Sequence, residues 1–159
     1  MTKSRIAAML TVLAVAVGVV AATPTAAYAA DQSYTVTLSG FTMKSWDGVI
    51  RSEAGTTTVT FWRNLAQDHY WMTYSTKIRD RSTDGFCAKA EFRSNGTLAS
   101  TWGYECNAVW KTYSGAFSDC YDLAINCHSF DILLGRGHQS GTEFDNDIYY
   151  KTAYAPADW

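Results

Sequence analysis

The sequence predicts an all-β fold, an antiparallel β-sandwich of about seven to nine short strands, with a closed β-barrel as the alternative. Three observations support this class. Apolar and polar residues alternate with a period of two, turn signals separate the alternating runs, and no run has the 3.6-residue apolar period and caps of a helix. Alternation of this kind is typical of strands that bury one face.

The beginning of the chain differs from the rest. Lys3 and Arg5 form a basic head, residues 6–22 are almost wholly apolar, and small residues follow at 26–30. This combination predicts a secretory signal peptide and therefore a secreted protein. An uncleaved membrane anchor is the alternative, but an apolar run of about 17 residues is at the short limit for spanning a bilayer.

The signal peptide is predicted to span 1–29, with cleavage after Ala29 or Ala30. A single β-sandwich domain, 30–159, is expected to remain, because neither an internal repeat nor a linker interrupts the alternation.

The net charge of the exported domain argues against some classes of partner. The 13 basic residues less Lys3 and Arg5 leave 11 against 15 acidic residues, a formal charge of −4. A nucleic-acid site needs a basic stripe to neutralise phosphates, so no nucleic-acid partner is expected. The same charge argues against attachment to an anionic membrane or wall polymer, and no membrane association is expected after cleavage.

The first predicted strand covers 34–38, where apolar residues alternate with threonine and serine until Gly40. A tight turn is expected at Asp47-Gly48. The second predicted strand covers 56–63, which is rich in β-branched and aromatic residues.

The strongest strand signal is the long alternation at 69–79. Residues 80–85 then supply a turn, and the return strand covers 86–93. Asn95-Gly96 is the best two-residue hairpin signal in the chain. Further strands are expected at 97–106, 109–113, 116–121, 129–134 and 142–150.

The exported part contains four cysteines: Cys87, Cys106, Cys120 and Cys127. An even count in an exported chain predicts two disulfides, for which three connectivities are possible. We favour Cys87–Cys106 and Cys120–Cys127, because each pair consists of sequence neighbours across a predicted turn or loop. A zinc site made of the four thiolates is the alternative, but the usual short Cys-Cys spacing is absent.

The stretch Ile78–Ala88 with its Asp84-Gly85 turn, followed by Cys120-Tyr121-Asp122 and Cys127, resembles a pattern in small exported actinobacterial β-rich proteins of unknown function. In those proteins a strand, a D-G turn and a small-residue strand precede a short loop bounded by two cysteines. The resemblance extends over about half of the mature chain. It implies a secreted β fold and supports the pairing of Cys120 with Cys127, and it implies no activity.

Candidate catalytic residues are few. Glu53, Arg63 and His69 are the base, phosphate clamp and acid that a small secreted ribonuclease would need, and they fall around a predicted hairpin. Glu53 lies in a turn-like stretch, however, and surface roles are favoured for His69, His128 and His138, which lack metal-site spacing. No cofactor or metal is expected, and the balance favours a protein without catalytic activity.

Two acidic segments were weighed as calcium sites, because calcium needs several oxygen ligands converging on one point. The segment with Glu143 lacks the glycine turn of an EF-hand loop, and solvated carboxylates are the favoured interpretation of both segments. The residues concerned are Glu143, Asp145 and Asp147 in one segment and Asp119, Asp122 and Asn126 in the other.

Two tryptophans are the favoured binding residues. If residues 65–68 close a hairpin, Trp62 lies opposite Trp71, and both project from threonine-rich faces. Paired exposed tryptophans form a stacking platform for sugar rings or a protein hot spot. The alternative is that this face packs against a second sheet. We therefore predict a non-catalytic binding module for a glycan or an extracellular protein; the alternatives are a small secreted hydrolase such as a nuclease, and a structural or coat component.

Overall fold

The computed structural model describes residues 31–94, 99–120, 128–138, 143–145 and 148–157, with the backbone alone at 119 and 120. The predicted signal peptide and the predicted Cys120–Cys127 bridge lie outside this part. The described residues contain no helix, and so none that is long and apolar enough to cross a membrane.

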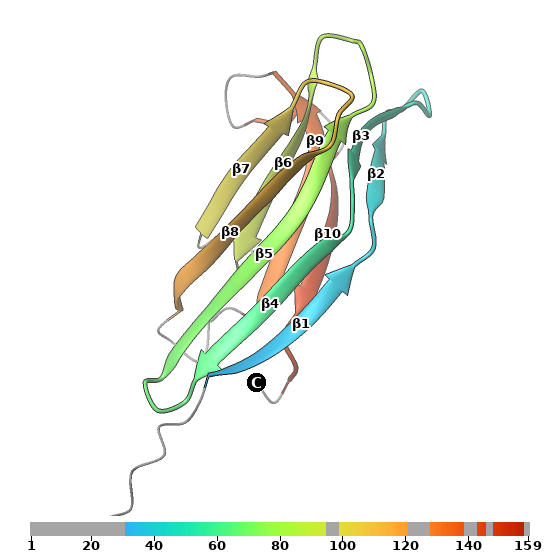
Figure 1. Ribbon diagram of the computed structural model, residues 1–159. Helices are drawn as coiled ribbons and strands as arrows, with labels where there is room; N and C mark the ends of the chain where they lie inside the picture. Colours follow the sequence, from blue (N-terminus) through green and yellow to red (C-terminus); the bar gives the residue numbers. More distant parts are fainter. Residues whose placement is uncertain (1–30, 95–98, 121–127, 139–142, 146–147, 158–159) are drawn as a thin grey trace, which may run out of the picture.

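The described strands form two antiparallel sheets that face each other, which confirms the predicted β-sandwich (Figure 1). The larger sheet has the order β1-β4-β5-β3-β2, with β8 also paired to β5, and the smaller sheet has the order β10-β9-β6-β7. The strands are β1 (Gln32–Leu38), β2 (Phe41–Lys44), β3 (Ile50–Ala54), β4 (Thr57–Asn64), β5 (His69–Asp80), β6 (Cys87–Ser94), β7 (Ala99–Glu105), β8 (Lys111–Cys120), β9 (Ser129–Gly137) and β10 (Tyr149–Tyr154).

The described part of the chain has ten strands, more than the seven to nine expected. The sequence analysis missed the β2–β3 hairpin around Asp47-Gly48, because its strands are only four and five residues long. It also divided β8 near Gly115. That glycine does not end the strand; a side chain there would meet the Tyr74 hydroxyl at 2.8 Å, so glycine lets the tyrosine ring lie against the backbone.

The core lies between the two inner faces, where alternate residues of each strand meet. Phe61, Met72 and Ile78 of the larger sheet and Phe92 and Ile132 of the smaller sheet are fully buried. Burying a side chain of this size contributes about 1.5–3 kcal/mol. The period-two alternation within each strand places these residues on one face, and it is this face that packs between the sheets.

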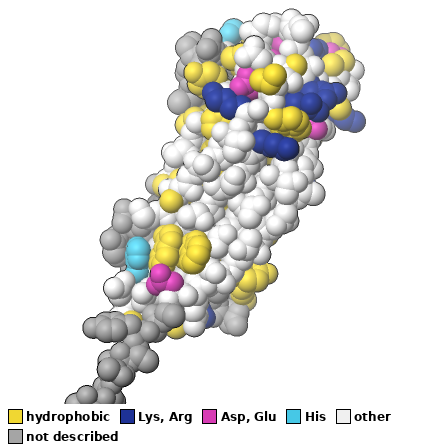
Figure 2. Space-filling view, viewed as in Figure 1, with side chains coloured by type: hydrophobic (Ala, Val, Ile, Leu, Met, Phe, Trp, Pro, Cys, Tyr) yellow, Lys and Arg dark blue, Asp and Glu magenta, His cyan; other side chains and the backbone are white. Residues whose placement is uncertain are grey.

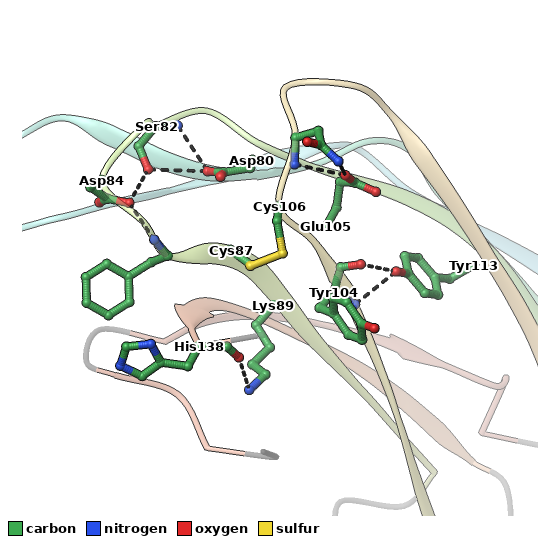
Figure 3. Close-up of a disulfide and its surroundings, with 12 residues drawn as sticks. Asp80, Ser82, Asp84, Cys87, Lys89, Tyr104, Glu105, Cys106, Tyr113 and His138 are labelled. Carbon is green, nitrogen blue, oxygen red and sulfur yellow. Dashed lines mark hydrogen bonds between the residues drawn. A yellow bond between two sulfur atoms is a disulfide. The ribbon is translucent and has the colours of Figure 1, made fainter. Parts of the chain in front are cut away.

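A disulfide joins the start of β6 to the residue after β7, as predicted (Figure 3). The two sulfurs of Cys87 and Cys106 are 2.03 Å apart, and the bond closes a loop with a sequence separation of 19. β6 and β7 are hydrogen-bonded neighbours, which brings the two cysteines together. The disulfide is consistent with an extracellular or periplasmic protein.

Candidate binding face

The tight connection between β4 and β5 sets the position of the two tryptophans. The side-chain oxygen of Asn64 accepts hydrogen bonds from the backbone N–H groups of Ala66 and Gln67, at 3.1 and 3.2 Å. Asp68 adopts a positive φ of 47°, a conformation that aspartate tolerates better than most residues. The hairpin closed in this way places Trp62 directly opposite Trp71, which is the arrangement predicted from the sequence.

The two indole rings are stacked on the outer face of the larger sheet. Their centroids lie 5.8 Å apart and their planes differ by 3°. His69 stacks on Trp71, with ring centroids 4.9 Å apart, and Trp62 Nε1 donates a hydrogen bond to the Thr73 hydroxyl. Both tryptophans are partly exposed, so the second sheet does not cover them.

Hydroxyl side chains occupy most of the remaining outer face of β1, β4, β5 and β8. The hydroxyls of Thr35 and Thr60 lie 3.0 Å apart across neighbouring strands. Figure 2 shows a broad uncharged area between the hydrophobic patch at one end of this face and a charged area at the other. We call this surface the open face; its strand register shows that it includes Ser33, Thr35, Thr37, Thr58, Thr60, Trp62, His69, Trp71, Thr73, Ser75, Lys77, Arg79, Thr112 and Ser114.

A third tryptophan lies at the charged end of the open face. Trp110 comes just before β8 and contacts two cations of β5: Lys77 Nζ lies 4.9 Å and Arg79 Cζ 4.4 Å from the centroid of its ring. The sequence analysis missed this residue. Trp110 continues the alternation of Thr112 and Ser114, so the pattern places it on their face, but only the pairing of β8 with β5 brings it to the cations.

The residues considered for a ribonuclease are not brought together. Glu53 is held by Arg79 and Arg81, at 2.7 and 3.4 Å. Arg79 is ten residues from His69 along β5, or about 33 Å at the rise of an extended strand. Arg63 is paired with Tyr70 and so belongs to the opposite face of the sheet from His69. The proposed base, clamp and acid therefore cannot act on one substrate.

The described residues contain no group of three or more His, Cys, Asp or Glu side chains that could hold a metal ion. Asp145 donates its backbone N–H to the Arg136 carbonyl, and Glu143 contributes a backbone carbonyl to Lys89. The ring of His138 packs against Phe86. The other residues considered for calcium, the side chain of Asp119 and all of Asp122, Asn126 and Asp147, lie outside the described part.

A hollow of about 440 Å³ lies beside the disulfide. Its one carboxylate is Asp80, which is 3 % exposed and accepts hydrogen bonds from the backbone N–H and hydroxyl of Ser82. Burial raises the pKa of Asp80 above its ordinary value. The described residues lining the hollow include no histidine and no carboxylate besides Asp80, although the Ser82 hydroxyl also lies 2.8 Å from Asp84 Oδ1.

No protein-family model matches the chain, and a search of curated proteins finds no similar sequence. The chemistry of the open face is therefore the basis for inferring a function. Stacked indoles offer apolar surface with a fixed geometry, and hydroxyls offer both donors and acceptors of hydrogen bonds. Together these groups suit a ligand that has apolar ring faces and many hydroxyls.

Proposed function

We propose that the protein is exported and acts as a non-catalytic binding module that holds a polysaccharide on the open face. The observation that carries this proposal is the partly exposed, stacked pair of Trp62 and Trp71. The C–H groups of a sugar ring form an apolar surface that packs against an aromatic ring and excludes water from both. Monomeric proteins seldom keep an aromatic patch on the surface unless a partner covers it.

The hydroxyl side chains beside the tryptophan pair support the same ligand. Thr60 and Thr73 lie opposite each other on β4 and β5, next to the two indoles along the strands. Their hydroxyls are suited to exchange hydrogen bonds with sugar hydroxyls, directly or through bridging water. Because these residues are held on adjacent strands, little conformational entropy is lost when a ligand binds.

Export is the second part of the proposal. It rests on the basic head, apolar run and small-residue site of the first thirty residues, and the disulfide agrees with it. Mass spectrometry of the protein recovered from culture medium should give an N-terminus at Ala30 or Asp31. A secreted form that keeps its first twenty residues would contradict the predicted cleavage.

The exposure of Trp46 supports a second candidate function, which is binding to an extracellular protein. It is 91 % exposed in the turn region between β2 and β3, away from the tryptophan pair, and tryptophan is enriched among the residues that dominate protein interfaces. An isolated indole is less extensive than the open face, so we place this candidate second.

The test measures retention of the purified mature protein on a panel of immobilised neutral and acidic polysaccharides. Trp71→Ala should weaken retention by at least about tenfold, because a central aromatic contact is lost. Trp46→Ala is the matched control, since it removes an indole outside the open face, and it should bind as the wild type does. Failure of the wild type to bind any polysaccharide, or equal binding by Trp71→Ala, would overturn the proposal.

A further inference from the structure

We propose that the polysaccharide is acidic, and that a carboxylate of a uronic-acid residue binds at the end of the open face farthest from the tryptophan pair. The proposed site is the cationic cluster, which we define as Lys77, Arg79, Arg81 and Trp110. This inference rests on the proposed function and adds to it the chemical class of the ligand. Figure 2 shows the Lys and Arg side chains gathered around hydrophobic ones at this end of the molecule.

The cluster carries more positive charge than its neighbours neutralise. Glu53 is the only carboxylate paired with it among the described residues, and its Oε2 lies 2.7 Å from Arg79 Nη2 and 3.4 Å from Arg81 Nη1. Three cations and one carboxylate leave a formal charge of +2. A ligand carboxylate would therefore find uncompensated positive charge at this site.

The cations of the cluster have different roles. Arg79 uses both Nε and Nη2 to hold Glu53, at 2.8 and 2.7 Å, so it positions the cluster and is not available to a ligand. Lys77 is exposed and forms no ion pair within the described residues, and the side chain of Arg81 is 41 % exposed. Lys77 and Arg81 are therefore the residues that we expect to contact the carboxylate.

Neighbouring residues hold the side chain of Lys77 in place. Its aliphatic stem crosses Gly55, where an added Cβ would lie 2.6 Å from Lys77 Cγ, so glycine leaves room for the lysine. The charged end then lies over the ring of Trp110. Cation–π contacts of this kind contribute about 0.5–1 kcal/mol at exposed sites and hold the cation without neutralising its charge.

The two ends of the open face are far enough apart to bind different residues of one polymer. Trp71 and Lys77 are on the same face of β5 and six residues apart, or about 20 Å at the rise of an extended strand. Thr73 and Ser75 lie between them on that face, and Ser75 is exposed. An extended polysaccharide along β5 can thus stack a sugar ring on the tryptophan pair and place a carboxylate at the cluster.

The overall charge of the protein favours a polymer with sparse acidic groups. Without Lys3 and Arg5 of the predicted signal peptide, the exported domain has 11 basic and 15 acidic residues, a formal charge of −4, so at long range it repels a dense polyanion. At short range, within a Debye length of about 8 Å at physiological salt, the cluster dominates. A polysaccharide whose neutral rings carry occasional uronic acids satisfies both conditions, whereas a nucleic acid or polyphosphate does not.

The experiment compares two polysaccharides with sparse free uronic acids, glucuronoxylan and largely esterified polygalacturonate, with the same polymers after reduction of their carboxylates to primary alcohols. At least one native polymer should bind about tenfold more tightly than its reduced form, because a hydrogen bond to a charged group is lost. This preference should weaken as salt is added. In the double variant Lys77→Gln/Arg81→Gln the preference should disappear while weak binding to the reduced polymer remains.

Lys151→Gln is the control for a lost surface charge, because it removes one positive charge from β10 in the other sheet, where the double variant removes two from the cluster. It should keep the preference for the native polymer. Equal binding of native and reduced forms, or an unchanged preference in the double variant, would overturn this inference while leaving the proposed function in place. If no polysaccharide binds at all, the proposed function fails and this inference fails with it.

Discussion

Charged side chains on the two outer faces of the sandwich differ in how far they are exposed to solvent. On the open face, Lys77 is exposed and its charge faces solvent. On the outer face of the smaller sheet, Lys89 is only 2 % exposed and Glu91 only 5 %. Part of this second surface is covered, and we call that part the covered face; its residues are Lys89, Glu91, Trp102, Leu133, Gly135 and Gly137, whereas Tyr104 and Tyr150 on the same side of the sheet are exposed.

The covered face owes its burial to two glycines of β9. An added side chain at Gly135 would meet the ring of Phe144 at 2.4 Å, and one at Gly137 would meet the carbonyl oxygen of Glu143 at 2.7 Å. Residues 143 and 144 therefore lie directly on the strand, and Phe144 also packs against Trp102, with ring centroids 5.1 Å apart.

Lys89 shows how a charge is accommodated beneath this cover. Its Nζ donates hydrogen bonds to the carbonyl oxygens of His138 and Glu143, at 3.1 and 3.2 Å, and Figure 3 shows the bond to His138 near the disulfide. The covered face thus serves stability, because its charges are satisfied internally. The open face keeps its aromatic and charged groups available to a ligand, and the following predictions test this division.

The largest effect is expected from Cys87→Ala/Cys106→Ala, which removes the covalent link at the edge of the smaller sheet. Closing a loop of this length stabilises the fold by about 3 kcal/mol, because the unfolded chain is restricted. Denaturant unfolding should show that loss, while polysaccharide binding in native buffer should be unchanged. Loss of binding by the folded variant would show that the open face depends on the disulfide.

A lysine on each face allows a direct comparison. Lys89→Met should lower the free energy of unfolding by about 2 kcal/mol, because two buried carbonyl bonds to a charged group are lost. Lys77→Met should change it by no more than about 0.5 kcal/mol, as is usual for a surface residue. If chemical denaturation shows equal losses of unfolding free energy for the two variants, the lysines of the two faces do not differ in their contribution to stability.

Trp71→Ala should shift the free energy of unfolding by less than about 1 kcal/mol, because the ring is partly exposed, although it should weaken polysaccharide binding by at least about tenfold. Thermal unfolding and the retention assay together check both parts. A loss of about 3–5 kcal/mol, the cost of a cavity left by a buried aromatic ring, would show that this residue supports the core.

The smallest effect concerns Asp80, which lies on neither outer face. Because burial raises its pKa, the folded protein holds this proton more tightly than the unfolded chain does. The contribution of Asp80 to stability is therefore greatest below pH 3.8 and is lost as pH rises through the folded pKa. The Asp80→Asn side chain can still accept the hydrogen bonds from Ser82. The melting temperature of this variant should exceed that of the wild type at neutral pH, and the two melting temperatures should be nearly equal below pH 3.8.

Local chemistry was enough to predict several parts of the structure. Alternation identified β4 and β5 and their buried residues, and the short connection between them set the register that pairs Trp62 with Trp71. The Cys87–Cys106 bond was predictable because its cysteines lie on neighbouring strands of a hairpin. The β2–β3 hairpin was not predictable in this way, since strands of four and five residues give too short an alternation.

What the sequence by itself determined is which residues share a face: a period of two follows from the geometry of one strand and needs no knowledge of its neighbours. Only the tertiary structure decided what lies over each face. The pairing of β8 with β5, and not with β7, brings Trp110 to Lys77 and Arg79. The packing of Phe144 on Gly135 and Trp102 likewise covers part of the other sheet. The contacts of Trp110 with Lys77 and of Phe144 with Trp102 join segments distant in sequence, and a local pattern carries no information about such contacts.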